Sequence, residues 1–132
     1  MEQHNVDKTL GLLSVARKAG KLQTGEETVG AMIFEKRARL IVLASDAGAA
    51  TVRRIKAQIE GTRQRYLQLG YDKETLGRAL GRPSVAVAAF TDVSLALAFI
   101  RTLESPDEEL AADLEQRVAR VKARRGTNSR KS

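Results

Sequence analysis

Few residues of this chain could carry out catalysis. His4 is the only histidine, and the chain contains no cysteine. A Ser–His–Asp arrangement would require His4, which lies close to the N-terminus with nothing in the sequence to position it. The lack of cysteine removes thiol nucleophiles, disulfides and thiolate-bound metals. Acid–base chemistry would therefore fall to carboxylates.

One pair of carboxylates stands in a suggestive place, Glu26 and Glu27 within "TGEETVG". Adjacent residues of a helix point in different directions, which disfavours joint acid–base work. The stretch is not a Walker loop, because no Gly-Lys-Ser/Thr follows, and no EF-hand or other metal-ligand spacing occurs. The sequence therefore predicts a protein that is not an enzyme and carries no metal or other cofactor.

The same stretch also has a purely structural interpretation. Thr24 and Glu27 match a capping box, in which each side chain satisfies a backbone amide at the other's position. Both glutamates would oppose the positive end of the helix dipole, by about 0.3–1 kcal/mol each. From the residues alone, a helix-end role and a binding role both stay open.

Charge is distributed unevenly along the chain, whose net charge is +7. Residues 1–103 carry 16 basic and 10 acidic residues, residues 104–116 carry six acids and no base, and residues 117–132 carry seven bases and no acid. Such a surface suits a polyanion such as RNA. Aromatic residues make up only 4% of the chain, so recognition of a folded RNA by shape is favoured over stacking of single-stranded bases.

The elements that must position these residues alternate between helix and strand. Hydrophobic spacing predicts helices over 7–18, after Thr24, after "SDAGAA", over "YDKETLGRALG" and over "TDVSLALAFIRTL", with strands at "KLQ", "ARLIVLAS", "RYLQL" and "SVAVAAF". The pattern predicts a three-layer α/β/α sandwich around a small, mixed, four-stranded sheet. Two of the strands are wholly apolar, so we expect them at the centre, covered on both faces.

The last 29 residues, 104–132, differ from the domain predicted over 7–103. "SPDE" predicts an amphipathic helix with Ser105 as N-cap and Pro106 in its first turn. The basic end "RRGTNSRKS" predicts a disordered tail, which could grip RNA or only aid solubility. The chain has no apolar run long enough for a membrane span and no secretory signal, so we expect a cytoplasmic protein without a membrane partner.

Three signals occur in order: Gly25 opening a helix, a hydrophobic strand ending in Ser45-Asp46-Ala47, and "LGRALG" before the last apolar strand. In this order the chain resembles the kink-turn RNA-binding superfamily of ribosomal proteins, and most closely its bacterial YlxQ-like branch, over about residues 7–103. The resemblance implies a non-catalytic protein that binds structured RNA, ribosomal or kink-containing, with a role near translation or ribosome assembly. Ribosomal or translation-related proteins would be further partners.

In that family RNA meets a helix N-terminus, the loop after the central strand and the loop before the last strand. The resemblance places the site here at Gly25, Glu26, Glu27, Thr28, Ser45, Asp46, Arg82 and Pro83. Arg17, Lys18, Lys21 and Arg78 would add phosphate contacts. Glu27, Thr28 and Ala31 stand where the family has Asn, Glu and Lys. A carboxylate in place of Asn can still accept from a guanine N–H or a cytosine amine.

An alternative hypothesis is that the protein is a protein-interaction adaptor, which keeps the fold but has lost the RNA site. The Glu26–Glu27 pair would then face a basic protein partner.

Overall fold

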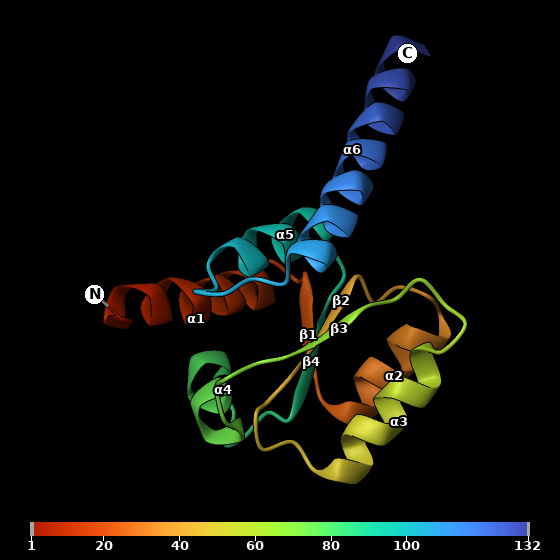
Figure 1. Ribbon diagram of the computed structural model, residues 1–132. Helices are drawn as coiled ribbons and strands as arrows, with labels where there is room; N and C mark the ends of the chain where they lie inside the picture. The colour runs from red at the N-terminus through yellow and green to blue at the C-terminus, as the bar shows by residue number, and fades with distance from the viewer. Residues whose placement is uncertain (1, 132) are drawn as a thin grey trace.

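The computed structural model describes residues 2–131, with side chains described for residues 8–125. Its sheet has four strands in the order β1-β4-β2-β3: β1 (Leu22–Thr24), β4 (Val87–Phe90), β2 (Leu40–Leu43) and β3 (Tyr66–Gln68). β4 runs antiparallel to β1 and β2, whereas β3 runs parallel to β2. The mixed sheet is confirmed, and the two wholly apolar strands lie at its centre as predicted (Figure 1).

Helices cover both faces of the sheet. α2 (Glu26–Phe34) and α3 (Ala49–Ile59) lie on one face, and α1 (Glu2–Lys18), α4 (Lys73–Leu80) and α5 (Val93–Arg101) lie on the other (Figure 1). Successive residues of a strand point to opposite faces. In β2, Ile41 therefore packs with α2 and α3 while Val42 packs with the other layer, so each face has its own core. The three-layer α/β/α sandwich is confirmed.

Two helices of the sandwich begin at a capping aspartate, whereas the start predicted for α2 is wrong. Asp72 caps α4 by accepting from the Thr75 amide at 2.8 Å, and Asp92 caps α5 by accepting from the Leu95 amide at 3.0 Å. The capping box at α2 is not formed. Thr24 is the last residue of β1, and the N-cap is Gly25, with no capping side chain. Because the Thr24 backbone belongs to β1, α2 begins later than the capping-box pattern predicts.

The last helix, α6 (Glu108–Lys131), also differs from expectation. Its first turn is capped by Asp107, which accepts from the Leu110 amide at 3.0 Å, and not by Ser105. Leu110 and Leu114 are buried in the same core as α1, α4 and α5. The first half of α6 therefore packs as part of the sandwich, although the sequence suggested an appendage.

The predicted disordered tail is helical in the structure, because α6 continues to Lys131 and extends beyond the sandwich (Figure 1). Gly126 is the only strong helix breaker in its second half, and basic residues suit the negative end of a helix dipole. The side chains of His4, Arg130 and Lys131 lie outside the described residues. Over the described part of the chain, no helix is long and apolar enough to cross a membrane.

Candidate nucleic-acid interface

Three segments that are distant in sequence meet at one end of the sheet. The Gly25 amide donates to the Val87 carbonyl at 3.0 Å, and the Ala44 amide donates to the Ala86 carbonyl at 2.9 Å. The start of α2, the end of β2 and the loop before β4 therefore adjoin. We call this surface the Gly25 rim. By this name we mean the residues predicted from the sequence in these three segments, which are Gly25–Thr28, Ser45–Asp46 and Arg82–Pro83.

The N-terminus of α2 is open at the rim. Gly25 has φ 101° and ψ 142°, a conformation that L side chains rarely adopt. Apart from the two neighbours of Gly25 in the chain, no described atom lies within 4 Å of the position that a Cβ would take on it, so a ligand can approach the backbone closely. The first amides of a helix have no intrahelical acceptor, and no side chain caps them here. They can therefore donate to a phosphate or to a base edge.

The two glutamates of the rim have different roles. The Glu26 carboxylate accepts from the Thr51 hydroxyl at 2.9 Å and from the Arg54 guanidinium at 2.5 and 3.1 Å. The hydrogen bond from Arg54 is the main cause that lowers the pKa of Glu26. Glu26 therefore joins α2 to α3, and its charge is compensated. Glu27 is exposed and remains available to a ligand.

The loop after β2 is held against the start of α4. Asp46 accepts from the Lys73 amide at 2.8 Å through one carboxylate oxygen. The Ser45 amide donates to the Tyr71 carbonyl at 2.8 Å. These two bonds fix the loop while the Ser45 side chain stays exposed.

The glycines of "LGRALG" shape the loop before β4. Gly81 ends α4 in the left-handed conformation, with φ 70°, and the Arg82 amide donates to the Gly77 carbonyl at 2.8 Å. A Cβ on Gly77 would lie 2.6 Å from the Arg82 carbonyl oxygen and 2.8 Å from the Ser84 Cα. Only glycine at this position lets the loop lie directly on the helix. The loop then presents Arg82 and Pro83 to solvent.

The predicted basic residues do not all gather at the rim. An Arg17 nitrogen lies 3.9 Å from the Cβ position of Gly81, so the end of α1 reaches the loop that carries Arg82. Arg78 lines a cavity of about 420 Å³ between α1 and α4. Lys21 lies at the other end of β1, where its carbonyl accepts from the Thr91 amide. Lys18 is exposed at the end of α1.

Sequence reasoning left Arg54 outside the site, although it pairs with Glu26. The two residues are 28 positions apart, and no pattern in the sequence joins them. Among the side chains that the structure describes, no group of three or more His, Asp or Glu is placed to hold a metal ion.

Similarity to known proteins identifies the family of this chain. Residues 7–98 match the sequence model of the Ribosomal protein L7Ae/L30e/S12e/Gadd45 family. The chain belongs to this family. A similar relative is the RNA-binding protein YlxQ of Bacillus subtilis (strain 168), which is 31% identical over 97 residues, 70% of this chain and 92% of that protein. The RNA-binding protein YlxQ of Enterococcus faecium is 38% identical over 56 residues, 42% of this chain and 54% of that protein. The YlxQ-like branch of the L7Ae/L30e family, expected from the motifs, is thereby confirmed.

Solved structures support the L7Ae/L30e-type fold. A protein with unknown function from Bacillus halodurans C superposes with a TM-score of 0.68 at 28% identity, covering 74% of this chain and 98% of that one. The Giardia lamblia 15.5kD RNA binding protein gives a TM-score of 0.62 at 18% identity, covering 86% and 89%. At that identity the second match speaks for the fold alone. The family match ends at residue 98, before α6 begins at Glu108.

Proposed function

We propose that this protein binds structured RNA at the Gly25 rim, without catalysing a reaction, and that it acts in the cytoplasm in translation or ribosome assembly. The observation that carries the proposal is the meeting of the α2 N-terminus, the loop after β2 and the loop before β4 at one end of the sheet. Two relatives in the same family are named RNA-binding proteins, and the alignment spans 92% of one of them.

The rim offers two kinds of contact that a nucleic acid needs. The uncapped amides at the start of α2 can donate to phosphate oxygens or base acceptors, and the bare Cα of Gly25 permits close approach. Arg82 supplies an exposed cation for the backbone, and Arg17 lies near the same loop. Glu27 can accept from a guanine N–H or a cytosine amine.

These contacts favour a bent RNA over a straight one. Reading a base edge with Glu27 requires a base that is not buried in a regular duplex, because side chains cannot reach into the narrow major groove of A-form RNA. The cation at Arg82 must meet a phosphate close to that base. A kink between two helices brings an exposed base edge and flanking phosphates together, so we propose kink-containing RNA, ribosomal RNA foremost, as the ligand.

The adaptor alternative gains nothing from the geometry. It required Glu26 and Glu27 to act as an acidic pair toward a basic protein. Glu26 is already paired with Arg54, so a single exposed carboxylate remains at this position.

Charge reversal at the rim tests the proposal. Arg82→Glu is compared with Lys8→Glu, which makes the same charge change on α1. The residue next to Lys8, Thr9, contacts Thr102 at the end of α5. The ligand is a fluorescent RNA of two short helices joined by an asymmetric internal loop, with a straight duplex as reference. We expect Arg82→Glu to weaken binding of the bent RNA about ten-fold or more, and the salt slope to fall by about 0.7–0.9 for the lost phosphate contact.

Lys8→Glu should change the affinity much less, since its charge lies away from the rim. Equal losses in the two variants would refute the location of the site. If wild-type protein binds neither RNA at moderate salt, RNA binding itself is refuted.

A further inference from the structure

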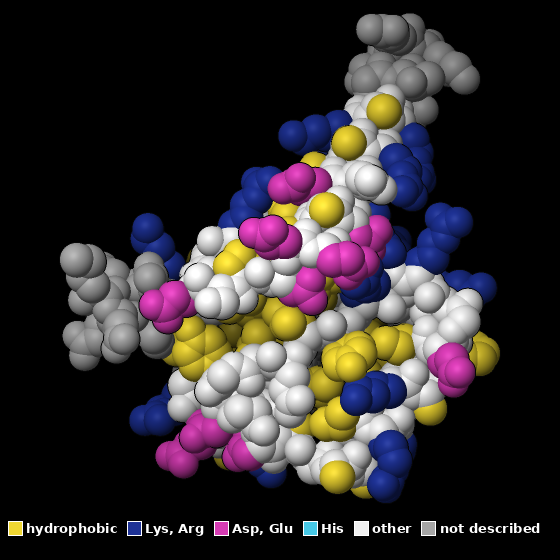
Figure 2. All heavy atoms as spheres, in the orientation of Figure 1, with side chains coloured by type: hydrophobic (Ala, Val, Ile, Leu, Met, Phe, Trp, Pro, Cys, Tyr) yellow, Lys and Arg dark blue, Asp and Glu magenta, His cyan; other side chains and the backbone are white. Residues whose placement is uncertain are grey.

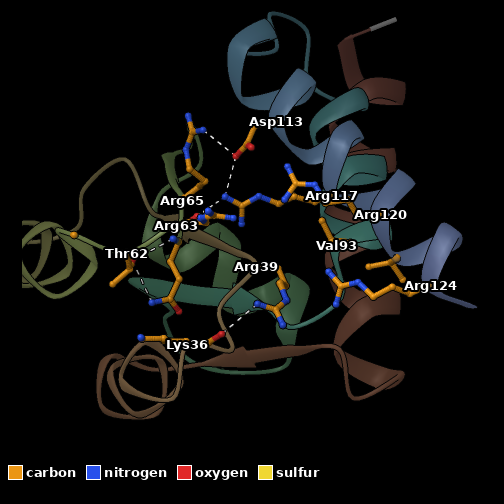
Figure 3. A pocket seen from close by; sticks show the side chains of 13 residues that line it. Lys36, Arg39, Thr62, Arg63, Arg65, Val93, Asp113, Arg117, Arg120 and Arg124 are labelled. Carbon is orange, nitrogen blue, oxygen red and sulfur yellow. Dashed lines mark hydrogen bonds and ion pairs between the residues drawn. The ribbon is translucent and has the colours of Figure 1, made fainter.

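A second concave surface lies at the opposite end of the sheet from the Gly25 rim. It is a cavity of about 930 Å³ between α6 and the connections that lead into β2 and β3 (Figure 3). Its lining residues include seven bases and one acid. The rim lies beyond Leu43, the last residue of β2, and this cavity lies before Leu40, the first. At a strand rise of about 3.3 Å per residue, at least about 10 Å of sheet separates the two. We call this cavity the basic groove.

The walls of the groove are fixed by interactions that do not involve a ligand. Buried Gln64 accepts from the Ala38 amide at 3.1 Å and donates to the Ile33 carbonyl at 3.0 Å, so it locks the two connections together. Asp113 of α6 accepts from Arg65 and from Arg117, each at 3.0 Å. These bonds hold α6 beside the entrance to β3 and neutralise part of the charge of two of the seven bases.

The other five bases have no acidic partner among the side chains that the structure describes. Lys36, Arg39, Arg63, Arg120 and Arg124 line the groove, and within the described side chains none of them forms an ion pair. In Figure 3, Arg39 and Arg124 extend into the groove from opposite sides. Like charges that share a concave surface repel each other and attract anions. The fold gains no stability from this arrangement, which instead favours an anionic ligand.

The chemistry of the lining points to phosphates and not to a nucleoside. No aromatic side chain lines the groove, and its only aliphatic side chains are Val93 and Val121, so a base would find no surface on which to stack. Guanidinium groups match phosphate oxygens in a bidentate fork.

On α6 the arginines form a row. Arg117, Arg120 and Arg124 recur three and four residues apart, which places them on one side of the helix over about 10 Å. A row of cations suits a chain of phosphates better than a single one. In Figure 2 acidic side chains gather over the start of α6, and basic side chains flank the helix farther along.

We propose that the basic groove is a second phosphate-binding surface, which receives the backbone of the RNA at a distance from the Gly25 rim. This inference rests on the proposed function, because it takes the polyanion to be RNA. It adds a site that the family match covers only in part, since that match ends at residue 98 and α6 supplies three of the arginines. One RNA could then be held at both ends of the sheet.

A pair of matched double variants tests the groove. Lys36→Gln with Arg124→Gln removes two cations that have no ion-pair partner. The control, Lys8→Gln with Lys122→Gln, removes two exposed cations outside the groove. Lys122 belongs to α6 itself, but it is two residues from Arg120 and therefore lies on another side of the helix. Binding of the same bent RNA is measured by fluorescence anisotropy over a series of salt concentrations, and thermal unfolding verifies that both variants are folded.

We expect the groove variant to lose at least about ten-fold in affinity, and its salt slope to fall by about 1.4–1.8 for two lost phosphate contacts. The control variant should keep nearly the wild-type slope. Equal slopes in the two variants would overturn the groove and leave the rim intact, whereas a groove effect without an Arg82→Glu effect would overturn the rim alone.

Two competitors separate RNA from other anions. Tripolyphosphate and polyglutamate are each titrated into the complex of wild-type protein with RNA and into the complex of the groove variant with the same RNA. Weak competition by both, needing a large excess over RNA, supports an RNA backbone as the ligand. If either competitor binds the wild-type groove more tightly than RNA does, the assignment to RNA is wrong. Absence of binding to any RNA would overturn the groove together with the proposed function.

Discussion

Gly77 provides a stringent test of how the loop before β4 is positioned. A Cβ at this position would lie 2.6 Å from the Arg82 carbonyl oxygen, 0.8 Å closer than the 3.4 Å at which ordinary contact begins, with Ser84 and Pro83 backbone atoms at 2.8 and 2.9 Å. Backbone atoms cannot rotate away as a side chain can, so the loop must move. Overpacking costs about 1–3 kcal/mol, and three backbone atoms closer than 3.0 Å place this case in the upper half of that range, at about 2–3 kcal/mol.

Alanine also gains about 1 kcal/mol over glycine from its helix propensity, so we expect Gly77→Ala to lower the free energy of unfolding by about 1–2 kcal/mol. For a chain of this size about 4 °C in Tm corresponds to 1 kcal/mol, so Tm should fall by about 4–8 °C. On the proposed function, affinity for bent RNA should fall as well, because Arg82 moves with the loop.

The matched control is Gly11→Ala in α1. A Cβ on Gly11 would meet nothing within 4 Å, so only the propensity gain remains. We expect Tm to rise by about 2–4 °C, for a gain of about 0.5–1 kcal/mol. Calorimetry or thermal circular dichroism measures both. A Gly77→Ala variant that melts at or above the wild-type temperature would show that this loop is not packed on α4 as described.

Three further predictions concern stability. Replacing Gly25 by Ala should cost about 1–3 kcal/mol in urea unfolding, since φ 101° strains an L residue, and an unchanged midpoint would contradict that conformation. Leu114→Ala should cost about 2–5 kcal/mol because Leu114 is fully buried, while exposed Gln116→Ala on the same helix should stay within about 0.5 kcal/mol; similar values would mean that α6 is not in the core. The hydrogen bond from the Thr75 amide lowers the pKa of Asp72 in the folded protein. The ionised Asp72 therefore stabilises the fold above its ordinary pKa of 3.8, and this stabilisation is lost as the pH falls through the lowered pKa of the folded state. Asp72→Asn keeps the cap but cannot titrate, so its Tm should decline less than that of wild type between pH 5 and pH 2, and parallel declines would refute the linkage.

The periodicity of apolar residues predicted the layers of this fold correctly. The apolar runs around Ile41 and Ala88 predict central strands, because only strands covered on both faces can be apolar throughout. The N-caps Asp72 and Asp92 act on amides three residues away, so such helix starts depend on local sequence alone. The failure at Thr24 has a non-local cause, since pairing of Thr24 with Ala88 in the sheet competes with the capping geometry.

The candidate sites differ in how much of them a sequence can reveal. The glycines that shape the rim leave a signal in the sequence, because Gly25 is needed for a positive φ and Gly77 for the close approach of the loop that carries Arg82. The basic residues of the groove leave no such signal in the sequence. Arg39, Arg63 and Arg120 come from three separate segments, and each alone resembles a solvated surface charge. The pairing of β2 with β3 and the packing of α6 across the sheet end bring them together.

The order of charges along α6 explains why that packing occurs. Acids before bases suit the helix dipole, which is what the sequence suggested. The structure adds a second cause, because Glu109 and Asp113 pair with Arg65, and Glu115 pairs with Arg101 of α5. Three acids of the first half of α6 thus dock the helix, together with buried Leu114. Among the described side chains of the basic half, Asp113 pairs with Arg117 alone, and Arg120 and Arg124 line the groove, where an anion can compensate their charge.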